Sequence, residues 1–426
     1  MILPRGTPRR AACAVAVAAL MAGAGLALSG LQPRAAASSG GWVATWAASP
    51  MAPTPLQPNL AVRGFADQTV RDIVFTSVGG RRVRIRLSNT FGARPLRIGQ
   101  ASVGVVRDGA GLLPGTIQPV LFDGRRSVTV RAGAEVISDP VPLPVSPMER
   151  LAVSIYLPDA TGPATYHEYA QQVNYVAAGD HAGDASPAAF TTRAPSWYFL
   201  DGVEVTAASR PGGSVVAFGD SITDGLGSTV GANDRWPNDL ARRLDAAFGS
   251  QAPGVVDEGI GGNRILHGSA CYGPSGLARF GRDVLEQAGV RDVIVLEGIN
   301  DIGFSRGPDT GCEAPATRVS AAQIIAGYEK LIAAARAYRV KIFAGTLTPF
   351  RGSFAWTPAA QVTWNEVNHW IRTSHAFNGV IDFARALADP GHPEYLNPAY
   401  NSGDGLHPDD AGYAAMANAI SLALLK

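Results

Sequence analysis

The pattern of apolar residues changes near residue 207, and this change constrains the fold more than any other feature of the chain. From Trp42 to about Thr206, apolar residues come in short runs separated by glycine-containing turns. In the runs 83–87 and 151–157, every second residue is Val, Ile or Leu, a period of two that is typical of half-buried antiparallel strands. We therefore predict an all-β accessory domain, a β-sandwich or jelly roll, over residues 38–206.

After a predicted linker at residues 207–213, apolar runs alternate with stretches of helical periodicity. The predicted strands are 214–219, 254–260, 292–297, 341–347 and 380–383, and the predicted helices are 236–248, 277–287, 320–338, 361–374 and 409–425. This order predicts a parallel sheet with right-handed crossovers and helices on both faces. The chain is also longer than one hydrophobic core usually supports, so we expect a second domain over residues 214–426.

Residues 1–37 have the features of a secretory signal peptide. Three arginines precede an alanine-rich apolar stretch that ends near Leu28, and Ala35-Ala36-Ala37 offers a small-residue cleavage site. An uncleaved membrane anchor is the alternative, although the stretch is short for a membrane span. Arg9-Arg10 leaves open whether export uses the general or the twin-arginine route. We expect a secreted, extracellular protein.

Charge and cysteine content narrow the function classes further. The signal peptide holds four arginines and no acidic residue, so its removal changes the net charge from +1 to about −3. No basic patch indicates nucleic acid as a partner, and no later segment is long enough for integral membrane association. The mature chain keeps Cys271 and Cys312, and an even pair in an exported chain predicts one disulfide, with two free buried thiols as the alternative.

Polar residues follow the predicted strands of the second half at their carboxyl ends. The first three strands run into Gly219-Asp220-Ser221, 259–263 and 298–301, and the segment 404–408 precedes the last predicted helix. Because the carboxyl ends of parallel strands meet at one edge of a sheet, these segments can form one site. A serine, a histidine, an aspartate, a glycine amide and an asparagine are the groups that acyl transfer needs.

These four segments, FGDSITDG, GIGGN, GIND and DGLHP, resemble in sequence and order the four blocks of the SGNH (GDSL-type) hydrolases. The resemblance covers residues 214–426 and implies a flavodoxin-like three-layer α/β/α fold with esterase or lipase activity. Ile222 stands where the family's name has leucine, an apolar exchange that does not touch the chemistry. The segments TWAASP, RIRLSNTFG and SWYFLDGVEV resemble the β-rich amino-terminal region of a secreted bacterial subgroup of the same family.

The resemblance implies a role for each site residue. Ser221 would be the nucleophile, and His407 would take its proton and return it to the leaving alkoxide. Asp404 would fix the tautomer and orientation of the imidazole ring. The N–H groups of Ser221 and Gly262, with the side-chain amide of Asn300, would form the oxyanion hole. The choice of Gly262 rests on register with the family's second block.

Other candidate residues receive simpler explanations. Asp301 is expected to cap or support a loop rather than to catalyse. His369 and His375 do not share a helix face, so we expect no metal site, and no organic cofactor is implied. Four aromatic residues are expected to pack in the core or between domains rather than to bind sugars: Trp42, Trp46, Trp197 and Tyr198. Three others either line an acyl pocket or pack: Phe350, Phe354 and Trp356.

Three functions remain open at this stage. The first is a secreted serine esterase or lipase acting on a small-molecule ester or a lipid. The second uses the same residues as an O-acetylesterase on an acetylated glycan, with the β-domain contacting carbohydrate. The third is a carbohydrate-binding protein without activity, which the retained Ser, Gly, Asn, Asp and His residues argue against.

Overall fold

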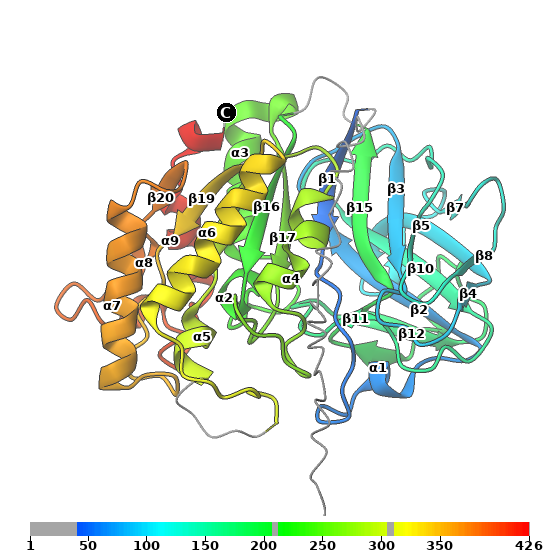
Figure 1. Cartoon of the computed structure of the whole chain (residues 1–426). Helices are drawn as coiled ribbons and strands as arrows, with labels where there is room; N and C mark the ends of the chain where they lie inside the picture. Colours follow the sequence, from blue (N-terminus) through cyan, green and yellow to red (C-terminus); the bar gives the residue numbers. More distant parts are fainter. Residues whose placement is uncertain (1–40, 207–211, 305–310, 426) are drawn as a thin grey trace, which may run out of the picture. The chain divides into compact units, whose positions relative to one another are not determined.

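The computed structural model describes residues 41–206, 212–304 and 311–425 (Figure 1). The predicted signal peptide and residues 207–211 of the predicted linker lie outside the described residues. Below, residues 41–206 are called the β-rich half and residues 212–425 the α/β half. Among the described helices, none is both long and apolar enough to span a membrane.

In its described residues, the β-rich half consists of antiparallel sheets. A seven-stranded sheet has the order β13-β12-β2-β10-β5-β6, with β7 also paired to β5, and a four-stranded sheet has the order β1-β15-β3-β9. Two further pairs are β11 with β14 and β4 with β8. The bounds are β1 Trp42–Ala47, α1 Leu60–Arg63, β2 Gln68–Phe75, β3 Val83–Ser88, β4 Leu96–Ile98, β5 Gln100–Asp108, β6 Gly111–Leu112, β7 Gln118–Val120, β8 Val128–Val130, β9 Glu135–Ile137, β10 Arg150–Leu157, β11 Tyr166–His167, β12 Asn174–Ala178, β13 Thr192–Ala194, β14 Trp197–Tyr198 and β15 Leu200–Thr206.

The prediction that these strands are half-buried is wrong for two of them. On β10, Ala152 packs in a second apolar cluster on the other face of the sheet, and Ser154 is buried as the acceptor of a hydrogen bond from Arg71 Nε at 2.8 Å. On β3, Arg86 is buried and forms an ion pair with Asp201 at 3.0 Å. Both faces are therefore covered, and the polar residues of the alternating pattern are paired rather than exposed to solvent.

The α/β half contains a parallel sheet with the strand order β17-β16-β18-β19-β20. In Figure 1, helix α6 (yellow) crosses in front of this sheet. The strand bounds are β16 Ser214–Gly219, β17 Gly254–Gly259, β18 Val290–Leu296, β19 Lys341–Gly345 and β20 Gly379–Ile381. The helix bounds are α2 Ser221–Asp224, α3 Trp236–Phe248, α4 Gly276–Phe280, α5 Ile299–Gly303, α6 Ala321–Ala337, α7 Pro358–Thr373, α8 Phe383–Leu387 and α9 Asp410–Ala419, with short helical turns η1 Gly249–Gln251, η2 Gly281–Leu285, η4 Pro398–Tyr400 and η5 Leu422–Leu425.

This strand order places the polar segments at one edge of the sheet. Strand β16 lies between β17 and β18, so the carboxyl ends of the first three strands are neighbours. Helix α3 joins β16 to β17, while α6 and α7 join β18 to β19 and β19 to β20. Because the strand order reverses at β16, right-handed crossovers put α3 on the opposite face from α6 and α7, and ligand sites of open α/β sheets are generally built at such a reversal.

Three predicted helices differ from the structure by more than one residue at an end. The predicted helix 277–287 is divided into α4 and the π-helical turn η2. Helix α7 begins at Pro358, before its predicted start, because the Thr357 side chain caps it and proline suits the first position of a helix. The last long helix, α9, ends at Ala419, since Ile420 has extended backbone angles.

One hydrophobic core runs through both halves. The four aromatic residues expected in the core are buried: Trp42, Trp46, Trp197 and Tyr198. They belong to the same apolar cluster as the strands of the parallel sheet, including Val215 and Val255. The described residues accordingly form one compact unit.

Polar contacts close the junction between the halves along strand β17. The N–H of Val255 on β17 donates to Ser77 Oγ at 2.9 Å, and the N–H of Ala44 on β1 donates to the carbonyl of Ala288 at 3.0 Å. A Cβ atom on Gly254 would lie 2.1 Å from the carbonyl oxygen of Ala44, so only glycine fits there. The β-rich half therefore covers the edge of the parallel sheet that is formed by β17.

Candidate active site

Ser221 lies at a tight turn between strand β16 and helix α2. The side chain of Asp220 caps α2 by accepting the N–H of Ile222 at 3.0 Å. A Cβ atom on Gly219 would lie 2.3 Å from the carbonyl oxygen of Leu296 on the next strand, so the turn requires glycine. Ser221 is therefore held at the carboxyl end of β16 by local sequence, with 4% of its surface exposed.

The structure brings His407 and Asp404 to this serine from the other end of the α/β half. His407 Nε2 lies 2.8 Å from Ser221 Oγ, and His407 Nδ1 lies 2.5 Å from Asp404 Oδ2. Because a carboxylate only accepts hydrogen bonds, the hydrogen of a neutral ring lies on Nδ1, and Nε2 accepts from the serine hydroxyl. The three predicted triad residues thus form one connected chain of hydrogen bonds.

Asp404 is held firmly although its side chain is 46% exposed. Its Oδ1 atom accepts the N–H groups of Leu406 and His407, at 2.8 Å each. Partial burial by itself would raise the pKa of Asp404, but the hydrogen bonds from His407 and from these backbone groups outweigh it and lower the pKa below its usual value. Asp404 therefore stays ionised beside the imidazole ring.

The turn after β17 presents one of its two glycine N–H groups to the site. The N–H of Gly261 donates to Asp224 Oδ2 at 3.0 Å, whereas no acceptor for the N–H of Gly262 is found among the described residues. Gly262 has a φ of +73°, and a Cβ atom there would lie 2.4 Å from a ring carbon of Tyr272. Of the two glycines, Gly262 is thus the one whose N–H is left available as a donor, and its place in an oxyanion hole stays a prediction.

Asn300 lies in the first turn of helix α5 and is 3% exposed. Its amide nitrogen donates one hydrogen to the carbonyl of Asn263 at 2.9 Å, which leaves a second hydrogen on the same nitrogen. The neighbouring Asp301 accepts the N–H groups of Ile265 and Leu266 at 2.7 and 3.1 Å. Asn300 thus offers a donor to the site, while Asp301 holds the loop that follows β17.

A buried arginine below the strand ends was not identified from the sequence. Arg279 is 1% exposed and donates to the carbonyls of Gly219 and Glu258 at 2.7 Å each. It also pairs with Glu297 and Asp283 at 3.2 Å. Its contacts bind the ends of β16 and β17 together next to Ser221, but a single arginine in a predicted helix carries no signal that could have revealed this.

A row of aromatic rings, Tyr272, Phe304 and Phe354, leads from the turn at Gly262 to the surface. Tyr272 covers Gly262 and stacks on Phe304 at 5.2 Å between ring centroids, and Phe304 stacks on Phe354 at 6.3 Å. Phe354 is 70% exposed. We call these three residues the aromatic row.

The loop that carries Phe354 also touches the loop that carries Asp404 and His407. A Cβ atom on Gly405 would lie 3.1 Å from the backbone of Gly352 and of Ser353, so the two loops are in close contact. The other two aromatic residues considered for an acyl pocket are packed: Phe350 is buried against Trp364, and Trp356 donates its indole N–H to Gln361. The aromatic row therefore connects the turn at Gly262 with the loop of Asp404.

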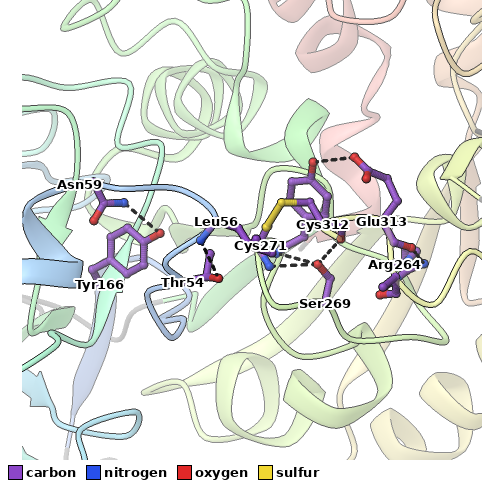
Figure 2. The surroundings of a disulfide bond; sticks show 11 residues. Thr54, Leu56, Asn59, Tyr166, Arg264, Ser269, Cys271, Cys312 and Glu313 are labelled. Carbon is purple, nitrogen blue, oxygen red and sulfur yellow. Dashed lines mark hydrogen bonds between the residues drawn. A yellow bond between two sulfur atoms is a disulfide. The ribbon is translucent and has the colours of Figure 1, made fainter. Parts of the chain in front are cut away.

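The predicted disulfide joins Cys271 and Cys312, whose Cα atoms are 5.1 Å apart (Figure 2). Ser269 lies beside it, accepting the N–H of Cys271 and donating its hydroxyl to the carbonyl of Cys312. Tyr272 follows Cys271 directly, so the disulfide braces the segment that covers Gly262. Among the described residues, no cluster of three or more His, Cys, Asp or Glu side chains could hold a metal ion.

Part of the chain matches the model of a known protein family. Residues 217–415 match the model of the GDSL-like lipase/acylhydrolase family, a range that contains all five predicted site residues. The chain therefore carries a GDSL-type ester hydrolase domain, which makes it an enzyme of the esterase or lipase class. No curated protein matches the chain.

Several solved structures resemble half of the chain. A GDSL-like lipase from Bacteroides thetaiotaomicron is 22% identical, with 50% of this chain and 88% of that one covered and a TM-score of 0.36. An α/β hydrolase from the metagenome of Lake Arreo is 22% identical, with 50% and 95% covered and a TM-score of 0.38. An acetylxylan esterase from Geobacillus stearothermophilus is 21% identical, with 50% and 94% covered and a TM-score of 0.39.

Proposed function

We propose that the chain is a secreted serine esterase that hydrolyses carboxylic esters with Ser221, His407 and Asp404. The observation that carries this proposal is the continuous contact from Ser221 Oγ to His407 Nε2, at 2.8 Å, and from His407 Nδ1 to Asp404, at 2.5 Å. Nucleophile and base within hydrogen-bond distance, with the base oriented by a third group, are the arrangement that nucleophilic catalysis requires.

In the first half of the reaction, His407 Nε2 takes the hydroxyl proton while Ser221 Oγ attacks the ester carbonyl carbon. Asp404 stabilises the imidazolium ion that forms and keeps its Nδ1 hydrogen directed away from the serine. The imidazolium then gives its Nε2 proton to the alkoxide oxygen, and the alcohol leaves. The acyl group remains bound to Ser221 as an ester.

In the second half, water replaces the alcohol. His407 takes a proton from a water molecule, whose oxygen attacks the acyl carbon, and then returns the proton to Ser221 Oγ as the carboxylic acid leaves. In both halves the developing oxyanion would be held by the N–H groups of Ser221 and Gly262 and by the amide of Asn300. Each such donor is worth about 3–4 kcal/mol of transition-state stabilisation.

The aromatic row favours an apolar acyl group over an acetylated sugar. The exposed ring of Phe354 offers apolar surface without hydrogen-bonding groups, the buried ring of Phe304 stacks behind it, and the hydroxyl of Tyr272 is directed to Glu313 at 3.4 Å. Alkyl chains need apolar surface, whereas sugar hydroxyls also need polar partners. We therefore place a small or medium alkyl ester first and an acetylated glycan second as substrate.

We also propose the organisation predicted from the sequence. A signal peptide over residues 1–37 would direct export, the β-sandwich of residues 38–206 would act as an accessory domain, and residues 214–426 would form the three-layer hydrolase domain. Mass spectrometry of protein recovered from the medium of an expressing culture tests the cleavage site. A mature chain that starts near residue 38 is the expected result.

The activity is tested with purified mature protein and Ser221→Ala on one substrate panel. The panel contains p-nitrophenyl esters from acetyl to palmitoyl, a phospholipid and acetylated xylan. Turnover of alkyl esters that depends on Ser221 is the expected result. Faster acetate release from xylan than from the simple esters would favour the alternative function, an O-acetylesterase that acts on glycans. If no substrate is turned over in a Ser221-dependent way, the third hypothesis, a non-catalytic binding protein, would be favoured.

A further inference from the structure

A histidine of the β-rich half reaches the α/β half beside the candidate oxyanion donors. His167 ends strand β11, and its Nε2 atom lies 3.1 Å from Oδ1 of Asp224, the last residue of helix α2. Its Nδ1 atom lies 2.9 Å from the carbonyl oxygen of Ser49. The side chains of His167 and Asp224 are 4% and 2% exposed, so water does not compete for these contacts.

His167 carries a hydrogen on both ring nitrogens, because both of its partners are acceptors. A carbonyl and a carboxylate oxygen can only accept, whereas a neutral imidazole has a single donor nitrogen. Burial by itself would lower the pKa of His167, but the charge of Asp224 and the hydrogen bonds to Asp224 and Ser49 outweigh it and raise the pKa. The contact is therefore a buried ion pair between the two halves.

The second oxygen of Asp224 holds the turn that follows β17. Asp224 Oδ2 accepts the N–H of Gly261 at 3.0 Å. Tyr169, two residues after His167, packs on the same glycine, since a Cβ atom on Gly261 would lie 2.9 Å from its ring. The next peptide carries the N–H of Gly262, so the direction of this N–H depends on how Gly261 is held.

We infer that His167 is a positioning residue of the hydrolase site. Through Asp224 it fixes the turn of Gly261 and Gly262 and so directs the Gly262 N–H at the carbonyl oxygen of the ester. The inference rests on the proposed ester hydrolysis, and it gives the β-rich half a part in the chemistry of the α/β half. An ion pair that only joined the halves would change stability and leave turnover unaffected.

Two substitutions separate the two hydrogen bonds of His167. The amide nitrogen of glutamine reaches about as far as Nε2, so His167→Gln keeps a donor for Asp224 and loses the bond to Ser49. Asparagine is one methylene shorter, so His167→Asn keeps a donor for Ser49 and loses Asp224. His181→Asn is the matched control, because the Nδ1 atom of His181 pairs with Asp184 at 2.8 Å elsewhere in the β-rich half.

For each variant, kcat and KM are measured with a p-nitrophenyl ester at a temperature below its own thermal unfolding transition. We expect His167→Asn to lower kcat about tenfold with little change in KM, since a misdirected donor costs less than the ~10²–10³-fold loss of a missing one and acts on the transition state. His167→Gln and His181→Asn are expected to stay within about twofold of the wild-type kcat.

A folded His167→Asn with the wild-type kcat, or equal losses in both His167 variants, would overturn the inference. If His167→Asn does not fold, Asp224→Ala is compared with Asp224→Asn, because asparagine can still accept from Gly261 and donate to a neutral His167. Equal, wild-type turnover of these two variants would also overturn it. If the wild type itself shows no turnover that depends on Ser221, the proposed function fails instead.

Discussion

Replacing Asp404 with asparagine should abolish most of the activity by reversing the tautomer of His407. Asp404 Oδ1 accepts the backbone N–H groups of Leu406 and His407, at 2.8 Å each. In Asp404→Asn the single carbonyl oxygen must take over these two bonds, so the NH₂ group faces His407 Nδ1. That nitrogen must then accept, the ring hydrogen moves to Nε2, and the ring can no longer take the proton of Ser221.

The expected loss in kcat is about 10⁴-fold, the size found where an asparagine forces the wrong tautomer in a serine–histidine–aspartate triad. At about 1.4 kcal/mol for each factor of ten, this is about 5.5 kcal/mol of activation free energy. The fold should tolerate the change, because the side chain is 46% exposed and asparagine keeps both backbone contacts. The KM value should change little, since the substrate itself does not contact Asp404.

The assay is steady-state hydrolysis of p-nitrophenyl butyrate, with thermal unfolding as the check on folding. Asp409→Asn is the matched control: Asp409 caps α9 by accepting the N–H of Gly412, and asparagine caps a helix equally well. A folded Asp404→Asn whose kcat stays within about tenfold of the wild type would refute the tautomer reasoning.

The same variant predicts a pH effect on stability. The folded-state pKa of Asp404 lies below its usual value of 3.8, so the hydrogen bonds that its carboxylate accepts stabilise the fold above that pH, and this stabilisation is lost as the pH falls further. Partial exposure keeps this contribution small. The difference in unfolding temperature between wild type and Asp404→Asn should therefore shrink as the pH is lowered from 7 to below 3.8; a constant difference would argue against this pairing.

Three further predictions test other parts of the site. Gly262→Ala should lower kcat about 10²-fold or more, because its Cβ would lie 2.4 Å from the Tyr272 ring and displace the oxyanion turn; a folded, fully active variant would remove Gly262 from the oxyanion hole. Replacing Cys271 and Cys312 by serine should lower the free energy of unfolding by about 3–4 kcal/mol, since the disulfide closes a loop of 41 residues; unchanged urea unfolding would contradict this. Phe354→Ala should raise KM for octanoyl but not acetyl esters at unchanged stability, because the ring is 70% exposed; equal effects on both esters would exclude the aromatic row from acyl binding.

The parallel sheet could be predicted because its signals are local. Strand β16 and helix α3 begin and end at the predicted residues, since each is defined by its own run of apolar or amphipathic residues. The position of Ser221 could also be predicted, because parallel strands bring their carboxyl ends to one edge of a sheet. Asp404 and His407 were named from the resemblance of their segment to a block of a known family. The structure places Ser221, Asp404 and His407 in contact, while their catalytic roles remain predictions.

Features that depend on a distant partner were not predictable. Arg86 is one of the polar residues of an alternating run, a position that predicts exposure to solvent. It is buried because it forms an ion pair with Asp201 on the neighbouring strand. His167 shows no local signal either, because its partner Asp224 lies 57 residues away in the other half. The aromatic row is likewise assembled from two loops and the end of helix α5, and only the fold shows that its rings stack. Burial of a charge can be anticipated only when both members of the pair are known.

The junction along β17 has a consequence for any attempt to produce the α/β half alone. An uncovered edge strand offers a row of unpaired backbone groups to any other chain, and such edges promote aggregation. Here Ser77 and the backbone around Ala44 occupy that edge. A shortened protein that starts at residue 212 would expose the β17 edge together with apolar side chains such as Val255. It should self-associate and precipitate even with every residue of the triad intact.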